Sequence, residues 1–474
     1  MKKGQIKEPD TADEFYDRGV DSEESGDRWF SSDLAKSLRF YHRAHQDYLN
    51  ALRLNPVNAD ALYNLPRLEF EVYTKYIKDD SVILDDLENC ADALNDNKAG
   101  GLFQDIPSLC RSFEASIQTL QQSGNDSLIG MDFYYNTAMC YYEYIDTLCA
   151  DPQNIGSLSP ETEVVKAIER CIMFFSKYFF SIRSVISGEN EKDDDLQTDL
   201  ESAANACIES YRMIATVFET TFSQQLIDTI SLVTDGFILQ VESFAEELSN
   251  AGIGETLLQS LKIAKLSERS SRILEFESLT QAWRSEESLN SLLEKQLIEA
   301  SSTRSFIDKF ETVGLTINAD VKWAILNALS IQYRKITEAL REDMAEAEKS
   351  QVLESDIIST KICLLCSVFI ERADIDLERS LLDTEVARES QEVLQNNSRN
   401  LLRNALIYSK KSGGIRESIG GKLTRKKRQR EAAMRLCLLE GKTQEDWNQI
   451  VGERYWPHEL QIIGELETYK RYFS

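Results

Sequence analysis

The chain has 474 residues, 42% of them hydrophobic and 28% charged, which is the composition of a folded protein rather than a disordered one. Its formal charge of −27 argues against a protein that binds nucleic acid or anionic lipid through most of its surface, and it would attract basic proteins. Only 7 Pro and 20 Gly are present, too few for the turns of a β-sandwich or barrel. Long helices with short connections are therefore expected.

The first elements can be read from the N-terminus onward. An acidic segment lies within residues 1–30, and residues 8–27 hold nine Asp or Glu and one Arg. Apolar residues then recur in steps of three and four over residues 34–52, which predicts an amphipathic helix. Asn55-Pro56 ends this helix, because the residue before a proline is pushed out of the α region. A second helix follows, and Pro66 inside it predicts a kink.

The same periodicity predicts helices over most of the remaining chain, with polar or glycine-bearing joints between them. The expected ranges are about 81–95, 105–123, 126–149, 160–187, 195–222, 223–249, 254–267, 270–300, 303–312, 320–347, 353–381 and 383–411. No stretch alternates apolar and polar residues with the period of a strand. The predicted fold class is therefore all-α.

Small and aromatic residues recur at regular places in the first two helices. They are Phe15, Gly19, Gly26, Ala44, Tyr48 and Ala51, followed by Pro56, and Leu62 and Leu65 begin the next helix in register. With these residues the segment 13–76 resembles the tetratricopeptide repeat, a 34-residue helix pair closed by a proline. The match requires about a dozen extra residues within the pair, and later segments show only echoes of the pattern. The resemblance implies antiparallel helix pairs stacked as a degenerate tetratricopeptide-like solenoid.

Tetratricopeptide arrays bind peptides or extended protein segments in a concave groove, so the resemblance implies a protein-binding scaffold or adaptor. One subgroup, the chaperone adaptors, holds the acidic tail of heat-shock proteins with Lys and Asn side chains. Asn64 stands at one such asparagine position and is a candidate partner-binding residue. Tyr16 and Val20 stand where the first repeat of that subgroup has Lys and Asn.

A basic segment interrupts this acidic chain near its end. Residues 410–430 hold nine Lys or Arg and one Glu, whereas residues 1–409 carry a formal charge of −32. Two Gly-Gly pairs predict a flexible linker here, between a helical repeat domain of residues 1–409 and a C-terminal helical cap of residues 431–474. The candidate partner-binding residues in the segment are Lys426, Lys427, Arg428 and Arg430.

Three interpretations of the basic segment stay open. It could be a solvated linker that pairs with the protein's own acidic surface. Residues 427–430 could be a nuclear import signal. The segment could also contact RNA or another acidic partner, although no aromatic residue lies within it to stack on bases.

Motifs for chemistry are scarce. The three histidines include His45, which lies on an apolar helix stripe, and Cys363-x-x-Cys366 is the only CxxC, with no second pair to complete a zinc site. We therefore expect no catalytic residue, no metal ligand and no cofactor. The nine cysteines are odd in number and no apolar leader opens the chain, which favours a reducing compartment, the cytoplasm or the nucleus.

Three functional hypotheses follow. The first is a non-enzymatic scaffold or adaptor that binds protein segments in a tetratricopeptide-like groove. The second is a dedicated acidic chaperone for a basic client such as a ribosomal protein or histone. The third is a helical enzyme with an unrecognised site. No run of about 18 apolar residues occurs, so no membrane partner is predicted, and nucleic acid is not expected as a partner except through residues 410–430.

Overall fold

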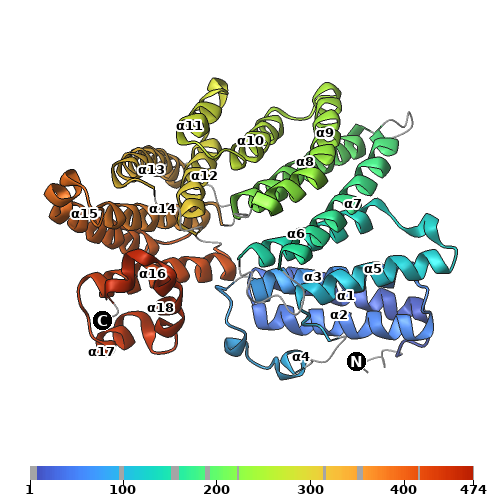
Figure 1. The fold of residues 1–474 in the computed structure, drawn as a ribbon. Coiled ribbons are helices and arrows are strands. Elements are labelled where there is room, and N and C mark those ends of the chain that lie inside the picture. The colour runs from blue at the N-terminus through green and yellow to red at the C-terminus, as the bar shows by residue number, and fades with distance from the viewer. Residues whose placement is uncertain are drawn as a thin grey trace. The chain divides into compact units, whose positions relative to one another are not determined.

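Every regular element in the described part of the chain is a helix, which confirms the all-α prediction (Figure 1). The computed structural model describes residues 8–472 apart from 79, 96–100, 151–159, 187–192, 221–223, 313–316, 350–355 and 415–416. The chain divides into two compact units, residues 1–286 and residues 287–474. The predicted boundary at residue 409 therefore does not coincide with the division of the fold.

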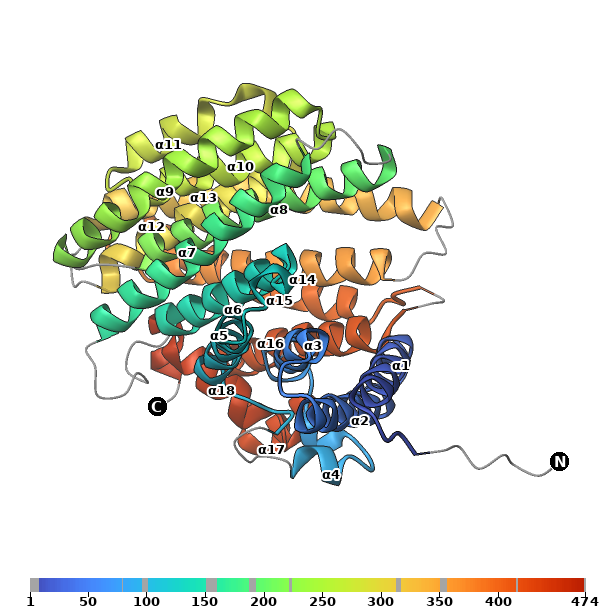
Figure 2. The ribbon, with the colours of Figure 1, turned by 90° about the vertical axis from the view of Figure 1, so that its right-hand side faces the viewer.

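The helices of the first unit stack in chain order. They are α1 (Ala12–Phe30), α2 (Leu34–Leu54), α3 (Ala59–Val72), α4 (Ala91–Leu94), α5 (Ile106–Gln122), α6 (Met131–Ala150), α7 (Pro160–Ile186), α8 (Asp193–Thr220), α9 (Gln224–Ala251), α10 (Glu255–Ser271) and α11 (Phe276–Arg284). Antiparallel pairs form between α1 and α2, α3 and α5, α6 and α7, and α8 and α9. Alternate helices also meet, α3 with α6, α6 with α8 and α8 with α10. The colours of Figures 1 and 2 show that the helices of the unit follow one another in chain order. This is a stacked array of helix pairs.

Two glycines allow α1 and α2 to pack closely. A Cβ atom on Gly19 would stand 2.6 Å from the Tyr48 ring, and one on Gly26 would stand 2.5 Å from the Tyr41 ring. Neither ring can swing away easily, because the Tyr48 hydroxyl donates to Glu23 at 2.7 Å and the Tyr41 hydroxyl donates to Asp27 at 2.6 Å. The absence of a side chain at both positions thus sets the distance between the helices.

The second helix pair begins as the sequence predicts. The Asn58 side chain caps α3 by accepting a hydrogen bond from the Ala61 amide at 2.9 Å, a common use of asparagine at a helix start. Helix α3 continues through the buried Pro66 and is followed by a π-helix, Tyr73–Lys78. The proline therefore does not end the helix.

Some predicted helix ranges were wrong. Residues 81–95 contain only a 3-10 turn, Leu84–Asp86, and the short α4 rather than one helix. Residues 270–300 are divided among the end of α10, α11, a 3-10 turn at Glu287–Leu289 and the start of α12. In the first range Asn89 has a φ of 57°, in the left-handed region, which a residue inside a right-handed helix cannot adopt.

The second unit is a separate group of helices. They are α12 (Leu293–Thr312), α13 (Ala319–Lys349), α14 (Ile357–Arg379), α15 (Glu385–Ser409), α16 (Ile419–Leu439), α17 (Gln444–Trp447) and α18 (Trp456–Glu465). Helix α14 lies at its centre and contacts α13, α15 and α16. The fully buried Tyr469 donates a hydrogen bond to Asp374 of α14 at 2.6 Å, and this bond holds the C-terminal segment on the unit.

The prediction of a flexible linker over residues 410–430 is wrong from residue 419 onward, because residues 419–430 belong to α16. Helix α16 begins at Ile419, with the Ser418 side chain accepting from the Gly421 amide at 2.9 Å. Gly421 serves close packing rather than flexibility, because a Cβ there would stand 2.8 Å from Asp356 Oδ1 and 2.9 Å from Ser359 Oγ. Composition alone could not separate these two uses of glycine.

The glycine contacts generate a stability prediction. Replacing Gly19 or Gly26 with Ala should lower the free energy of unfolding by about 1–3 kcal/mol, because the added methyl group overpacks a fixed tyrosine ring. Gly236 on α9 is the matched control, since a Cβ there meets nothing within 4 Å. Gly236→Ala should be neutral or should stabilise by up to about 1 kcal/mol. Chemical denaturation measures all three, and equal effects at all three sites would contradict the packing argument.

Candidate functional site

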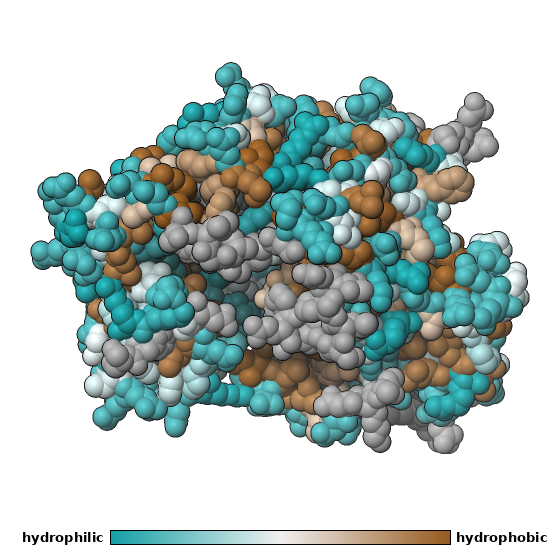
Figure 3. Space-filling view, viewed as in Figure 1, coloured by the Kyte–Doolittle hydropathy of each residue, from teal (hydrophilic) through white to brown (hydrophobic). Residues whose placement is uncertain are grey.

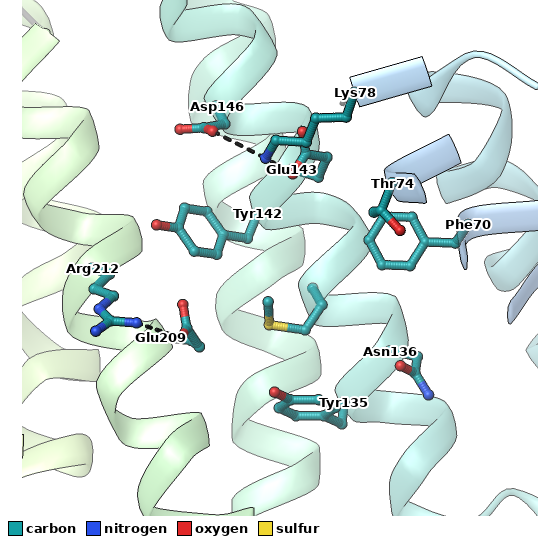
Figure 4. Close-up of a pocket in the computed structure, with 11 residues that line it drawn as sticks. Phe70, Thr74, Lys78, Tyr135, Asn136, Tyr142, Glu143, Asp146, Glu209 and Arg212 are labelled. Carbon is teal, nitrogen blue, oxygen red and sulfur yellow. Dashed lines mark hydrogen bonds and ion pairs between the residues drawn. The ribbon is translucent and has the colours of Figure 1, made fainter. Parts of the chain in front are cut away.

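A cavity of about 490 Å³ lies within the first unit, on the face where alternate helices of the stack meet (Figure 4). It is lined from α3 and the following π-helix by Phe70, Thr74 and Lys78, from α6 by Tyr135, Asn136, Met139, Tyr142, Glu143 and Asp146, and from α8 by Glu209 and Arg212. We call these residues the groove residues. Their partner helices α5 and α7 contribute no lining residue.

The groove residues of α6 form one stripe along that helix. Tyr135, Met139, Tyr142 and Asp146 recur in steps of three and four, which places them on one side. The opposite side carries Phe133, Cys140, Tyr141, Ile145 and Leu148, which are buried in the core between the helix pairs. Helix α6 thus has an apolar face for packing and a mixed aromatic and charged face for the groove.

The charges of the groove are paired across and along helices. Lys78 Nζ contacts Glu143 of α6 and lies 3.5 Å from Asp146 Oδ2, while Arg212 Nη1 donates to Glu209 at 2.9 Å (Figure 4). Burial alone would lower the pKa of Lys78, but the Glu143 and Asp146 carboxylates outweigh it and raise that pKa. Burial likewise raises the pKa of Tyr142. Both groups are moved away from neutral pH.

Asn64, the predicted partner-binding residue of the first repeats, does not line the cavity and is engaged in hydrogen bonds within the protein. Its Nδ2 donates to the Tyr16 hydroxyl at 3.0 Å, and its Oδ1 accepts from Arg67 Nε at 3.0 Å. The next repeat has the same arrangement, because Asn136 Nδ2 donates to the Tyr63 hydroxyl at 2.8 Å. Each asparagine therefore bonds a tyrosine of the preceding repeat.

The basic residues predicted to contact a partner lie on α16, which belongs to the second unit. The groove residues belong to the first unit. Arg428 contacts Glu431 at 2.7 Å, Lys427 lies 3.9 Å from Glu431, and Arg430 lies 3.5 Å from Glu459. Lys426 is exposed. Three of the four predicted contact residues are therefore engaged within the unit itself, and they are helical where the prediction had a flexible linker.

The other residues with possible chemistry are in the core. His45 Nε2 lies 3.0 Å from Glu69 Oε1, with both side chains buried. Cys363 and Cys366 are buried too, and burial raises the pKa of each thiol. Over the described residues, no three His, Cys, Asp or Glu side chains come together as a metal site would require, and no helix is long and apolar enough to cross a membrane.

Sequence reasoning missed the groove residues of α6 and α8. The one sequence feature that could have indicated them is the stripe of groove residues on α6. This stripe does not stand out in the sequence, because aromatic residues occur on every side of the helix over residues 131–144. The surface gives little help, since hydrophobic atoms appear in several separate groups among hydrophilic ones in Figure 3. The contact of three alternate helices is what identifies the site.

Comparisons with known proteins show similarity to a protein family, to two curated proteins and to solved structures. Residues 285–461 match the family described as the YNL193W C-terminal domain, which covers nearly all of the second unit. The chain is 23% identical over 535 residues to the Uncharacterized protein YNL193W of Saccharomyces cerevisiae, covering 92% of this chain and 91% of that protein. It is 40% identical over 73 residues to the UPF0656 protein C926.02 of Schizosaccharomyces pombe, covering 15% and 16%.

One of these solved structures is a circular tandem repeat protein with novel repeat topology and enhanced subunit contact surfaces. It covers 98% of both chains at 13% identity, with a TM-score of 0.23. That score is too low to indicate a common arrangement of helices.

The contacts of α16 predict that a hydrogen-bonded basic residue and an exposed one contribute differently to stability. Arg425 makes two hydrogen bonds to Glu417, at 2.9 and 2.8 Å, and donates to the Ser409 carbonyl at 2.8 Å. Arg425→Ala should cost about 1–3 kcal/mol of folding free energy, whereas Lys426→Ala, its exposed neighbour, should change it by less than about 0.5 kcal/mol. Denaturant titration of both variants is the measurement.

The ion pair between Arg425 and Glu417 also makes the folding stability depend on pH. Burial raises the pKa of Glu417, but Arg425 and Ser359 outweigh it and hold that pKa below the ordinary value of 4.5. The stabilisation is therefore complete above pH 4.5 and is lost as the pH falls further. The difference in stability between wild type and Arg425→Ala should shrink in that range. A difference that stays constant to low pH would contradict the role given to Glu417.

Proposed function

We propose that this protein is a non-enzymatic scaffold whose first unit binds an extended segment of a partner protein along the groove residues. The observation that carries the proposal is the cavity of about 490 Å³ where α3, α6 and α8 meet. Aromatic, thioether and charged side chains line it together, the mixture that fixes a ligand through apolar contact and orients it through a few polar groups.

As part of this proposal, the helix pairs of the first unit are tetratricopeptide-like repeats. The family resemblance places small residues where helices approach, and Ala44, Tyr48 and Ala51 are fully buried at the contact with α1. Asn64 and Asn136 hold equivalent positions one repeat apart. Such arrays bind protein segments on the face formed by the first helix of each pair, and the groove residues come from helices in that position.

The groove charges support binding rather than proton transfer. A general acid or base works best with a pKa near the operating pH. The pKa of Lys78 is raised by its two carboxylates and that of Tyr142 by burial, so both move away from neutrality. The proposal is therefore of a binding groove and not of an active site.

The distribution of charge between the two units favours a basic protein as the partner. Residues 1–286 contain 50 Asp and Glu against 25 Lys and Arg, whereas residues 287–474 contain 30 against 28. Nearly the whole net charge thus belongs to the unit that contains the groove. A segment rich in Lys or Arg would be steered toward this unit and would lose that advantage as salt screens the charges.

The first test fills the groove. Met139→Trp enlarges a side chain that lines the cavity, and Leu232→Trp, on α9, makes a similar change at a side chain that is 85% exposed. We expect proteins captured by the tagged wild-type chain from its native cells to be lost with Met139→Trp and retained with Leu232→Trp. Partners captured equally by all three would contradict binding in the groove.

The second test varies the salt in the same capture. A basic client held by charge should be recovered at about 0.1 M salt and released near 1 M, where the screening length falls to about 3 Å. Partners that stay bound at high salt and show no basic bias would favour the adaptor over the chaperone for a basic client. Mass spectrometry identifies the captured proteins and hence their charge.

A further inference from the structure

Three arginines converge on one face of the second unit, and none of them has a carboxylate partner among the described residues. Arg334 and Arg341 of α13 lie seven residues apart, on the same side of that helix. Arg372 of α14 reaches the middle of this side, where its Nη1 donates to Thr337 Oγ1 at 3.2 Å. In the described part of the chain none of the three forms an ion pair, and Arg372 Nε is buried with no hydrogen-bond partner.

The nearby carboxylates do not neutralise this arginine cluster, by which we mean Arg334, Arg341 and Arg372. Asp376 is already held by Arg379 at 3.0 Å and by Ser330 at 3.3 Å. Glu338 is exposed and lies between Arg334 and Arg341 on α13, but it bonds to neither. Burial lowers the pKa of Arg372 and the other two arginines lower it further, although Asp376 and Glu338 act in the opposite direction.

Aromatic rings hold part of the cluster in place. The Arg341 guanidinium lies 5.3 Å from the centre of the Phe369 ring and 5.7 Å from that of Tyr408 on α15. Lys411 lies over the same Tyr408 ring at 4.9 Å. Arg341 of α13 is therefore fixed against aromatic rings of α14 and α15, and Lys411, just beyond the end of α15, is a further cation at the same Tyr408 ring. Like charges brought together in this way destabilise the free protein unless an anion joins them.

We propose that the arginine cluster is a binding site for a short anionic protein segment, one that carries a phosphorylated side chain or a run of Asp and Glu. Arginine suits this role because its planar guanidinium makes two parallel hydrogen bonds to a phosphate or carboxylate. Clusters of arginine on a helical surface are a recurrent means of recognising acidic and phosphorylated motifs. The site is separate from the groove residues, which belong to the other unit.

A short segment fits better than a nucleic acid. The second unit has a formal charge of only −2 and the first unit one of −25, so a long polyanion would meet repulsion beyond the cluster. The Tyr408 ring lies against Arg341 and Lys411 and is not presented for stacking on bases. A short segment with a few negative charges is enough to neutralise the three arginines of the cluster.

The test uses the full-length chain and three fluorescein-labelled peptides. One is a Gly-Ser peptide with two phosphoserines, the second is the same peptide without phosphate, and the third replaces the phosphoserines with a run of Glu. Fluorescence anisotropy at about 50 mM salt, where charge contacts are weakly screened, gives each affinity. The variants are Arg334→Glu, Arg341→Glu, Glu338→Gln and, as control, Lys335→Glu, an exposed residue of α13 that makes the same charge change off the cluster's side.

We expect the two anionic peptides to bind and the unphosphorylated one not to bind. Arg334→Glu and Arg341→Glu should each weaken binding about tenfold or more, since each removes a charge-assisted contact. Lys335→Glu should stay within about twofold of wild type, and Glu338→Gln should bind more tightly because a competing carboxylate is gone. The better of the two anionic peptides identifies the source of the anion.

Other results would overturn the proposal. Equal weakening by Lys335→Glu would mean general attraction and no site. Failure of both anionic peptides to bind would remove the site altogether, and tighter binding of a labelled single-stranded oligonucleotide would replace the protein segment with nucleic acid. Circular dichroism of each variant checks the fold, and because Arg334 and Arg341 are both exposed, either one alone is enough for the comparison.

Discussion

The structure of the first unit depends on one continuous core between stacked helices. Buried side chains form a single cluster that runs from Leu62 on α3 to Ala264 on α10. Each helix pair covers the apolar face of the next, so no pair could bury its own hydrophobic surface alone. The groove residues lie at the margin of this core, where Tyr135, Met139 and Tyr142 of α6 are partly buried against it and also line the cavity.

Packing also explains why the polar network of the first repeats is ordered. The Glu23 carboxylate is buried between α1, α2 and α3, where it accepts from the Tyr48 hydroxyl and pairs with Arg67. Arg67 in turn holds Asn64, which bonds Tyr16. A buried carboxylate needs such partners, because an unpaired one would cost several kcal/mol. The network therefore fixes the register in which the first three helices meet.

The two units use charge in different ways. The first unit is strongly acidic overall, yet the carboxylates of its groove hold the two local cations, Lys78 and Arg212, in place. The second unit is nearly neutral, and its cations fall into two groups. Arg425, Arg428 and Arg435 are bonded to Glu417, Glu431 and Asp374, whereas the arginine cluster on α13 and α14 has no such partner within the part of the chain that the structure describes. Paired cations stabilise the unit, and unpaired ones remain available to a ligand.

The sequence by itself determined the helical class, most helix positions and the close packing of the first pair. Periodicity and capping are local properties, and the small-residue pattern marked Gly19 and Tyr48 as repeat positions, although only the structure shows that they contact each other. Tertiary structure alone decided which side of α6 faces a cavity, that Gly421 packs against Asp356 and does not form a linker, and that the chain divides near residue 286. Arg334 and Arg372 are 38 residues apart in the sequence, so only the packing of α13 on α14 could bring them together. These features are contacts between distant segments, and a local pattern holds no information about which helix will lie opposite.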